Sequence, residues 1–114
     1  MAMDLAEKVQ RKTLQFPVFA RNELGRQMRL SADSVPANIA EGYGRSRYTN
    51  DFKRFLVNAL GSCTELGCQL DLALQYGYVS EEEHKGLQES REHLSRSLHV
   101  MIEKWRKLDK DTRD

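Results

Sequence analysis

The 114-residue chain is predicted to be all-α: an antiparallel up-down four-helix bundle whose second helix is kinked by a proline. Two observations lead to this prediction. Apolar residues recur three and four positions apart through most of the chain, which is the spacing of a buried helix face. No segment shows the strict alternation of apolar and polar residues that is typical of a half-buried strand. We expect one domain over residues 1–114, with helices at about 3–16, 18–41, 50–76 and 81–109.

The first predicted helix is short and carries one buried stripe. Leu5, Val9 and Phe16 lie on this stripe, with charged residues between them. Pro17 ends the helix. Because proline also suits the first turn of a helix, where its missing N–H costs nothing, the second helix is expected to begin near residue 18.

The second predicted helix contains Pro36. Its core-facing stripe continues on both sides of the proline and consists of Leu24, Met28, Ala32, Val35 and Ile39. Proline deletes the hydrogen bond to the carbonyl of Ala32, at a cost of about 3 kcal/mol in an unsupported helix. Because the periodicity continues, we expect a kink here rather than a stop, with Ser31 and Ser34 helping to satisfy the freed carbonyl region.

The third predicted helix is apolar round most of its circumference. Its first stripe is Leu56, Ala59, Cys63, Leu66, Leu70 and Ala73, and its second stripe is Val57, Gly61, Thr64, Cys68 and Leu72. A small bundle leaves one side of each helix open, so this helix has more apolar surface than one chain can cover. The surplus predicts burial between subunits, and the first expected partner is therefore a second copy of the chain.

The fourth predicted helix has clear signals at its start. Gly77 suits the left-handed position just after the third helix, and Ser80 with Glu83 forms a capping box that opens the next one. Apolar residues then keep heptad spacing for nearly thirty residues, and Arg91 is the only polar residue in that seam.

Charge is close to balance overall and unevenly distributed along the chain. The net charge is +1, which supplies no global field toward nucleic acid or an acidic membrane. Residues 1–54 hold ten basic and six acidic side chains, whereas residues 55–84 hold five acidic and no basic ones. Surfaces of opposite sign on one small domain suit self-association or a polar partner, and solvated helix faces are the alternative interpretation.

Several function classes receive no support from the sequence. The charged first 16 residues do not resemble an export signal, and no run approaches the length of a membrane span, so we expect a cytoplasmic protein without a membrane partner. Cys63 and Cys68 cannot bridge within one helix and are expected to be reduced.

No catalytic, metal-binding or cofactor-binding constellation is recognisable. Glu81 and His84 have the Glu-x-x-His spacing of carboxylate-bridged metal bundles, but such a site needs this motif twice. We predict no catalytic residue, no metal, no cofactor and no small-molecule substrate, and hence no enzyme.

A basic and aromatic cluster follows the second helix. It comprises Tyr43, Arg45, Arg47, Tyr48, Lys53 and Arg54. Guanidinium groups that bind phosphate and tyrosines that stack on bases are what single-stranded or looped RNA requires, so RNA or DNA is the alternative partner. Arg26 and Arg29 could extend this cluster, or they could pair with Glu65 and the acidic residues 81–83 of a neighbouring chain.

The most distinctive stretch of the chain is SVPANIAEGYGR, residues 34–45. Its structural residues are predicted to be Ser34, Pro36, Asn38, Glu41, Gly42 and Gly44. Asn38 and Glu41 are expected to satisfy polar groups near the kink or at a subunit contact. Gly42 is expected to end the helix.

This stretch, with the preceding Gln-Met-Arg of residues 27–29 and the later Gly77-Tyr78, resembles the four-helix bundle proteins encoded by intervening sequences in bacterial 23S ribosomal RNA genes. Relatives of that family include the accessory variability determinant proteins of diversity-generating retroelements. The resemblance implies an antiparallel four-helix bundle that assembles into a ring-like homopentamer. For the retroelement relatives it also implies binding to reverse transcriptase and nucleic acid, whereas most stand-alone members have no established activity.

Two functional hypotheses follow. The first is a non-enzymatic, cytoplasmic homo-oligomer, expected to be a pentamer, that serves as an assembly or interaction module. The second is a nucleic-acid-binding accessory protein that acts with RNA or a reverse transcriptase. The net charge of +1 is low for the second hypothesis, because phosphate contacts dominate the affinity of proteins for nucleic acid.

Overall fold

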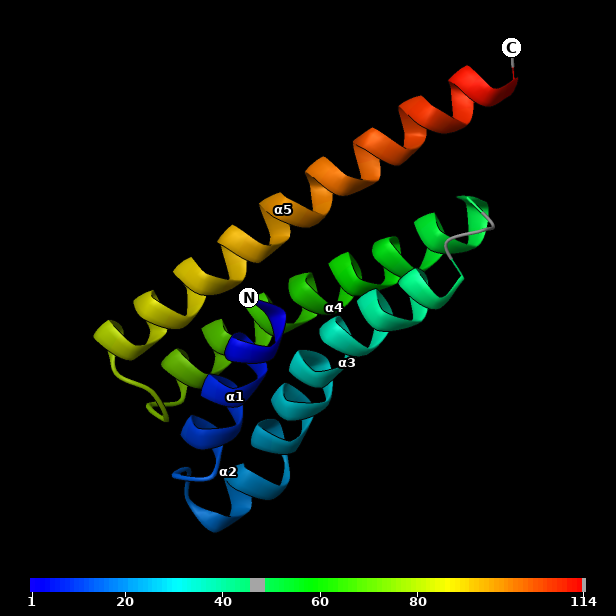
Figure 1. The fold of residues 1–114 in the computed structure, drawn as a ribbon. Coiled ribbons are helices and arrows are strands. Elements are labelled where there is room, and N and C mark those ends of the chain that lie inside the picture. Colours follow the sequence, from blue (N-terminus) through cyan, green and yellow to red (C-terminus); the bar gives the residue numbers. More distant parts are fainter. Residues whose placement is uncertain (46–48, 114) are drawn as a thin grey trace.

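The protein is built from helices that lie side by side in an elongated bundle. The computed structural model describes residues 1–45 and 49–113. The helices are α1 (Ala2–Thr13), α2 (Val18–Asn22), α3 (Leu24–Gly44), α4 (Thr49–Gln75) and α5 (Glu81–Arg113). The described residues contain no strand, which confirms the all-α prediction, and the four longer helices agree with a four-helix bundle. The molecule measures 55 × 22 × 18 Å (Figure 1).

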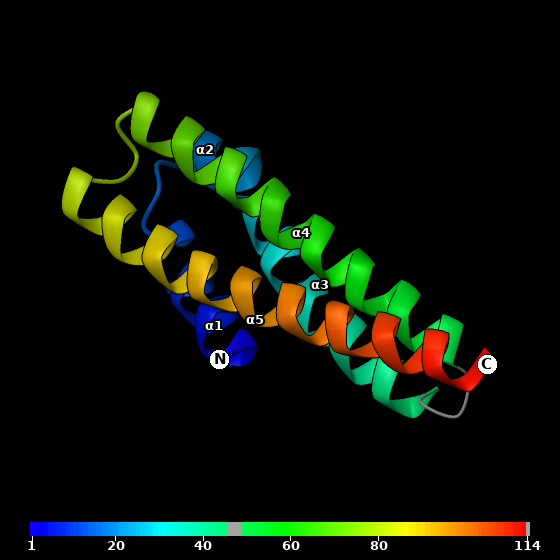
Figure 2. The same cartoon turned by 90° about the horizontal axis from the view of Figure 1, so that it is seen from above.

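The four longer helices contact one another in a closed order. α3 packs most extensively on α4, α4 packs on α5, and α1 packs on both α3 and α5. The short α2 packs on α3. In Figures 1 and 2, α1 lies beside the first half of α5, and the second half of α5 extends well past it. Each long helix therefore has two neighbours and one face that points away from the bundle.

The predicted core stripes are buried or packed against the core. The buried apolar residues form one cluster to which all five helices or their connections contribute. Every member of the first stripe of α4 is completely buried, namely Leu56, Ala59, Cys63, Leu66, Leu70 and Ala73. The helical periodicity of the sequence thus identified the core-facing side of α4 correctly. No helix in the described part of the chain carries a stretch apolar enough to cross a membrane.

α1 ends at Thr13, three residues before the predicted boundary at residue 16. The backbone N–H groups of Gln15 and Phe16 donate to carbonyls three positions earlier, at distances of 3.0 and 3.1 Å, so the chain tightens into turns here. Because Pro17 disfavours helical geometry at the residue before it, the helix cannot continue to Phe16.

The predicted second helix is two helices rather than one. It breaks at Glu23, which has φ −108° and ψ −92°, between α2 and α3. In a continuous helix the carbonyl of Arg21 would accept a hydrogen bond from the backbone of Gly25. Instead it accepts one from Nη2 of Arg29 at 3.1 Å. The guanidinium group therefore replaces a backbone donor and makes the break possible.

α3 continues past the predicted stop at residues 41–42 and ends at Gly44. Pro36 lies inside this helix, as the periodicity predicts. Gly42 is buried against α4: a Cβ atom at this position would lie 3.3 Å from Cβ of Phe55. Gly42 thus serves close packing of two helices instead of ending the first.

The connection between α4 and α5 follows the sequence signals closely. Gly77 has φ +79°, and the N–H groups of Gly77 and Tyr78 donate to the carbonyls of Leu74 and Ala73 at 3.0 and 2.8 Å. These two bonds form a Schellman motif, which ends α4. Ser80 and Glu83 exchange the two hydrogen bonds of a capping box, at 2.8 and 3.0 Å, so both predictions for this turn are confirmed.

Candidate interaction surfaces

The end of the bundle where α3 ends and α4 begins gathers part of the predicted basic and aromatic cluster. We call it the α3–α4 end. Tyr43 is 58% exposed, and its ring packs edge-on against Phe52, with 5.3 Å between the centroids. Phe52 in turn packs on Trp105 of α5, at 4.5 Å. A row of three aromatic rings therefore links α3, α4 and α5 at this end.

The arginines of the α3–α4 end surround a further aromatic ring. The guanidinium carbons of Arg45 and Arg54 lie 5.5 and 5.0 Å from the ring centroid of Phe55. Both side chains are exposed. Lys53, the residue before Arg54, is partly buried. Cation–π contacts of this kind orient guanidinium groups without using all of their N–H donors.

Acidic side chains neutralise much of this basic charge. Arg45 donates to Glu41 at 2.9 Å and lies 3.9 Å from Asp51, and Arg54 lies 3.8 Å from the same Asp51. The hydrogen bond to Glu41, followed by the charge of that carboxylate, raises the pKa of Arg45. Two of the three cations that the structure describes here are thus already paired, which lowers the attraction of this end for phosphate.

The remaining members of the predicted cluster do not join it. Arg47 and Tyr48 lie outside the described residues. Arg26 and Arg29 lie near the start of α3, whereas Arg45 follows its end. Arg29 is half-buried and donates to Oγ1 of Thr13 at 3.0 Å as well as to Arg21. The expectation that Arg26 and Arg29 extend the patch is therefore wrong for the α3–α4 end.

The residues around Pro36 satisfy carbonyl groups on both sides of Ala32. The hydroxyl of Ser34 donates to the carbonyl of Ser31 at 3.0 Å and also contacts Ser62 of α4. Nδ2 of Asn38 donates to the carbonyl of Ser34 at 2.7 Å. These bonds lie beside the carbonyl of Ala32 that Pro36 frees, and the role predicted for these residues at a kink stays a prediction.

Of the other predicted structural residues, Gly42 is buried between helices, and Glu41 and Gly44 are exposed. Glu41 pairs with Arg45 and not with a group near the proline. Gly42 packs against α4, as described above, and a Cβ atom at Gly44 would meet no atom within 4 Å. Gly44 therefore has no packing role that the described residues account for.

The second stripe of α4 points away from the core. Its members Val57, Gly61, Thr64, Cys68 and Leu72 are all exposed. We call this surface the α4 outer stripe. Val57 and Leu72 are 47% and 37% exposed, and Gly61 has no atom within 4 Å of its Cβ position. The α4 outer stripe is thus an apolar helix face that its own chain leaves uncovered.

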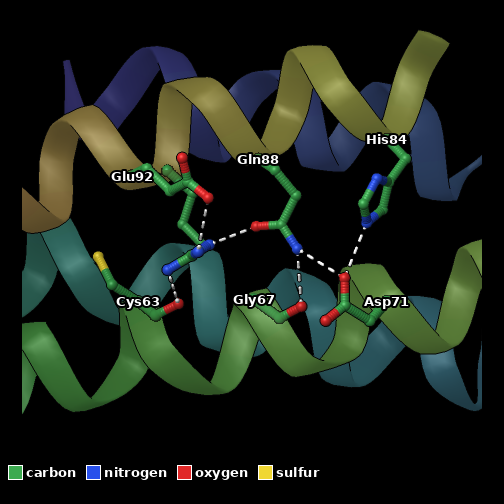
Figure 3. Close-up of polar contacts among 7 residues, drawn as sticks. Cys63, Gly67, Asp71, His84, Gln88 and Glu92 are labelled. Carbon is green, nitrogen blue, oxygen red and sulfur yellow. Dashed lines mark hydrogen bonds and ion pairs between the residues drawn. The ribbon is translucent and has the colours of Figure 1, made fainter. Parts of the chain in front are cut away.

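A polar network that the sequence did not predict lies between α4 and α5 (Figure 3). Gln88 donates from Nε2 to the carbonyl of Gly67 at 2.9 Å and to Asp71 at 3.0 Å. Nε2 of His84 lies 2.8 Å from the same Oδ1 of Asp71. The hydrogen bond from His84 is the main cause that lowers the pKa of Asp71.

Arg91 forms the second half of this network. Nε donates to Oε1 of Gln88 at 2.6 Å, and Nη1 donates to the carbonyl of Cys63 at 3.3 Å. Gly67 provides the space for this guanidinium group, because a Cβ atom there would lie 2.8 Å from Cζ of Arg91. Arg91 is the one polar residue in the heptad seam of α5, and Gly67 lies opposite it on α4. A polar residue in one helix and a glycine in its neighbour are the sequence signal that could have predicted this contact.

The network lines an open groove of about 690 Å³ but contains no recognisable catalytic arrangement. The exposed side chains that line the groove are Asp71, Lys85, Glu89 and Glu92. Among the residues that the structure describes, no three His, Cys, Asp or Glu side chains converge in the way a metal ion requires. His84 contacts Asp71 and not Glu81, which was its partner in the metal motif considered above.

Comparisons with known proteins identify relatives but no activity. The profile of a family described as 23S rRNA-intervening sequence proteins matches residues 1–100. A crystal structure from Bacteroides thetaiotaomicron VPI-5482, described as a protein of unknown function from the S23 ribosomal protein family, is similar with a TM-score of 0.67 and 25% sequence identity. The similarity covers 82% of this chain and 97% of that one. No match was found among curated proteins.

Proposed function

The chain belongs to the family of 23S rRNA-intervening sequence proteins, and from this premise we propose that it is a non-enzymatic assembly or interaction module that works as a homo-oligomer in the cytoplasm. The expected assembly is a ring of five copies. The observation that carries the proposal is the α4 outer stripe, which is apolar, exposed and directly opposite a completely buried core stripe on the same helix.

The composition of α4 supports self-association over simple exposure. Single exposed apolar residues are normal on a protein surface, whereas a continuous apolar helix face marks an interaction site. The α4 outer stripe extends over four turns, from Val57 to Leu72, and the exposed carboxylates of Glu65 and Asp71 flank it within this span. Such a face gains stability when a second copy covers it.

The antiparallel order of the helices and the kink at Pro36 belong to the same proposal. Contacts between α4 and α5 support the antiparallel order, because residue numbers rise on one helix as they fall on the other. The pairs are Asp71 with His84, Gly67 with Gln88, Cys63 with Arg91 and Phe52 with Trp105. The hydrogen bonds to the carbonyls of Ser31 and Ser34 support a local distortion at the proline.

Light scattering coupled to size-exclusion chromatography tests this function. The native chain is expected to elute as one species with a mass several times 13.2 kDa at micromolar concentration. A Leu72→Glu variant, in which a charge is placed on the α4 outer stripe, is expected to shift the population toward the monomer. A stable monomer of the native chain at high micromolar concentration would overturn the proposal.

A nucleic-acid-binding accessory role, with RNA or a reverse transcriptase as partner, is the second candidate. It is favoured by the meeting of Tyr43, Arg45 and Arg54 at the α3–α4 end. The local acids limit its electrostatic contribution, so we expect weak binding that depends strongly on salt.

Filter binding of a fluorescent single-stranded RNA at low and high salt measures this second role. An Arg45→Ala, Arg54→Ala double variant should weaken binding, and Arg26→Ala, at the opposite end of α3, is the matched control. Equal binding by both variants would exclude the α3–α4 end as the RNA site.

A further inference from the structure

The beginning of the chain forms an arm that folds back on the rest of the bundle. We call α1, α2 and the turn between them the N-terminal arm. α1 packs on α3 and α5 and takes the fourth position of the bundle (Figure 1). Leu5, Val9 and Phe16 of the arm are buried in the core. A single residue, Glu23, connects the arm to α3.

Arg29 of α3 holds the arm in its bent position. Nη1 donates to Oγ1 of Thr13 in α1 at 3.0 Å, and Nη2 donates to the carbonyl of Arg21 in α2 at 3.1 Å. Gly25 makes room for the bend, because a Cβ atom there would lie 3.2 Å from the carbonyl oxygen of Ala20 and 3.3 Å from Cβ of Thr13. The bent joint therefore depends on two residues of α3 that contact both helices of the arm.

The local sequence favours a straight joint instead. Residues 18–24 contain neither glycine nor proline, and the apolar periodicity of α3 continues back to the buried Ala20. Once Arg29 releases the carbonyl of Arg21, the backbone N–H of Gly25 can donate to it, as in any continuous α-helix. The same carbonyl is satisfied in both arrangements, so the joint has a bent and a straight form.

A straight joint carries α1 away from its own bundle. Residues 18–24 would then extend α3 by about 10 Å, at 1.5 Å per residue. α1 would lose its contacts with α3 and α5, and its buried apolar stripe would face water. This open form is unfavourable for a single chain, because apolar surface is exposed on both the arm and the bundle. A second open copy supplies the matching surface for each of them.

We propose that two copies of the chain exchange their N-terminal arms. α1 of each copy then lies between α3 and α5 of the other, and α2 continues α3 as one helix. The apolar contacts of α1 are kept, because the partner has the same sequence, and the joint is the main difference from the closed chain. Domain swapping of this kind costs little once the hinge can straighten. The inference goes beyond the proposed function, since it does not use the α4 outer stripe.

Lys12 and Glu83 report which chain supplies α1. Nζ of Lys12 lies 2.5 Å from Oε2 of Glu83. Among the residues that the structure describes, this is the only ion pair between the arm and the rest of the chain. Glu83 is also held by Ser80 in the capping box of α5. In the closed chain both members of the ion pair belong to one molecule, and after exchange they belong to two.

Isotope mixing combined with zero-length cross-linking tests the exchange. Unlabelled and heavy-isotope-labelled chains are mixed in urea, refolded together at low and high concentration, and treated with a water-soluble carbodiimide. This reagent joins an amine to a carboxylate in contact with it. Mass spectrometry then determines whether the joined peptides of Lys12 and Glu83 carry the same label or different labels. For the native chain we expect same-label pairs at low concentration and mixed-label pairs that increase with concentration.

Arg29→Ala is expected to increase the exchange. It frees the carbonyl of Arg21 for the straight helix, so the fraction of mixed-label pairs should rise at least fivefold at equal concentration. Arg26→Ala is the matched control, because Arg26 is exposed and forms no hydrogen bond or ion pair within the described part of the chain. This control should exchange like the native chain.

Leu24→Pro is expected to abolish the exchange. Leu24 is the first residue of α3, where proline is favoured and where the backbone N–H has no partner within the helix. In a straight joint the same proline would delete the hydrogen bond to the carbonyl of Ala20 and clash with it. Leu24→Ala is the matched control for the lost side chain and should give mixed-label pairs like the native chain.

Two results would overturn the inference. One is the absence of mixed-label pairs from both the native chain and Arg29→Ala at every concentration. The other is an equal frequency of these pairs in Leu24→Pro and Leu24→Ala, because the chains would then meet without a straight joint. Helical circular dichroism verifies that each variant folds, and if Arg29→Ala does not, the native chain and the two Leu24 variants decide. Light scattering tests the proposed function separately, since a chain that is monomeric at low concentration can still exchange arms at high concentration.

Discussion

Gly67 of α4 lies directly beneath the guanidinium group of Arg91 of α5: a Cβ atom at Gly67 would come within 2.8 Å of Arg91 Cζ. The contact explains how a long, charged side chain fits into an otherwise apolar seam. Arg91 lies across the backbone of α4 and donates to the carbonyl of Cys63, while Gln88 donates to the carbonyl of Gly67 itself. Two polar side chains thus bind backbone groups of the neighbouring helix at a glycine, where no side chain of α4 blocks the approach.

Gly67→Ala is therefore expected to lose the stability gain that alanine normally brings to a helix. Displacement of Arg91 breaks its bond to the carbonyl of Cys63, a loss of about 1–2 kcal/mol, which offsets the gain of about 1 kcal/mol from replacing a helical glycine. Gly86→Ala, with open space at its Cβ, should show the gain alone. Urea unfolding monitored by circular dichroism compares the two, and equal stabilisation of both variants would contradict the role of Gly67.

Gly77→Ala is expected to cost about 1 kcal/mol of unfolding free energy. The cause is the backbone, because φ of Gly77 is +79° and a side chain there has no atom within 4 Å to collide with. Gly77→Asn should recover part of the loss, since asparagine tolerates the left-handed conformation better than alanine. Thermal unfolding of the three chains measures this order, and an alanine variant as stable as the native chain would be inconsistent with it.

Two carboxylates are expected to contribute to the loss of stability in acid. Hydrogen bonds lower the pKa of Asp71, chiefly from His84, and the pKa of Glu83, chiefly from Lys12 at 2.5 Å. Because each folded pKa lies below its unfolded value near 4, the contribution is present above about pH 4 and disappears as pH falls through the folded pKa.

The two carboxylates are exposed, so solvent screening keeps each contribution to a few tenths of a kcal/mol. An Asp71→Asn, Glu83→Gln double variant should therefore lose less stability than the native chain between about pH 5 and pH 2. Urea unfolding at several pH values determines both slopes. Identical slopes would mean that other carboxylates account for the acid dependence.

Cys63 is expected to resist alkylation in the folded protein. Burial raises the pKa of its thiol to about 11, and the nearby Arg91 lowers it only in part. Since the thiolate is the reactive form, iodoacetamide near neutral pH should leave Cys63 unmodified. Peptide mapping by mass spectrometry after treatment with and without urea measures the protection. Rapid modification of Cys63 without denaturant would show that this part of the core opens readily.

Local signals and helical periodicity predicted much of the fold. Gly77 and the pair Ser80 and Glu83 each act within a few residues, so their hydrogen bonds can be read from the sequence. The buried stripe of α4 could be predicted because it repeats over many turns. In contrast, the break at Glu23 depends on the hydrogen bond between Arg29 and the carbonyl of Arg21, which forms only when the chain has folded back on itself.

The candidate sites were harder to predict for the same reason. Arg45 belongs to a basic and aromatic stretch of the sequence. Its guanidinium group forms ion pairs with Glu41 and Asp51 of its own chain, and these pairs reduce its attraction for an external anion. Arg29 appeared available for an external partner and is instead bonded to Thr13. The pair of Glu41 and Arg45 has the i,i+4 spacing that a sequence can reveal, whereas the contact between Arg29 and Thr13, sixteen positions apart, forms only in the folded bundle.

The row of rings formed by Tyr43, Phe52 and Trp105 gives the protein an intrinsic optical reporter. Trp105 is the only tryptophan, and it packs on Phe52 at the α3–α4 end, far from the capped turn between α4 and α5. Its fluorescence therefore reports on one end of the bundle, whereas circular dichroism reports on all helices together. If that end opens before the rest, the emission maximum will shift to longer wavelength while most of the helical signal remains, so two ordinary spectra can distinguish local opening from global unfolding.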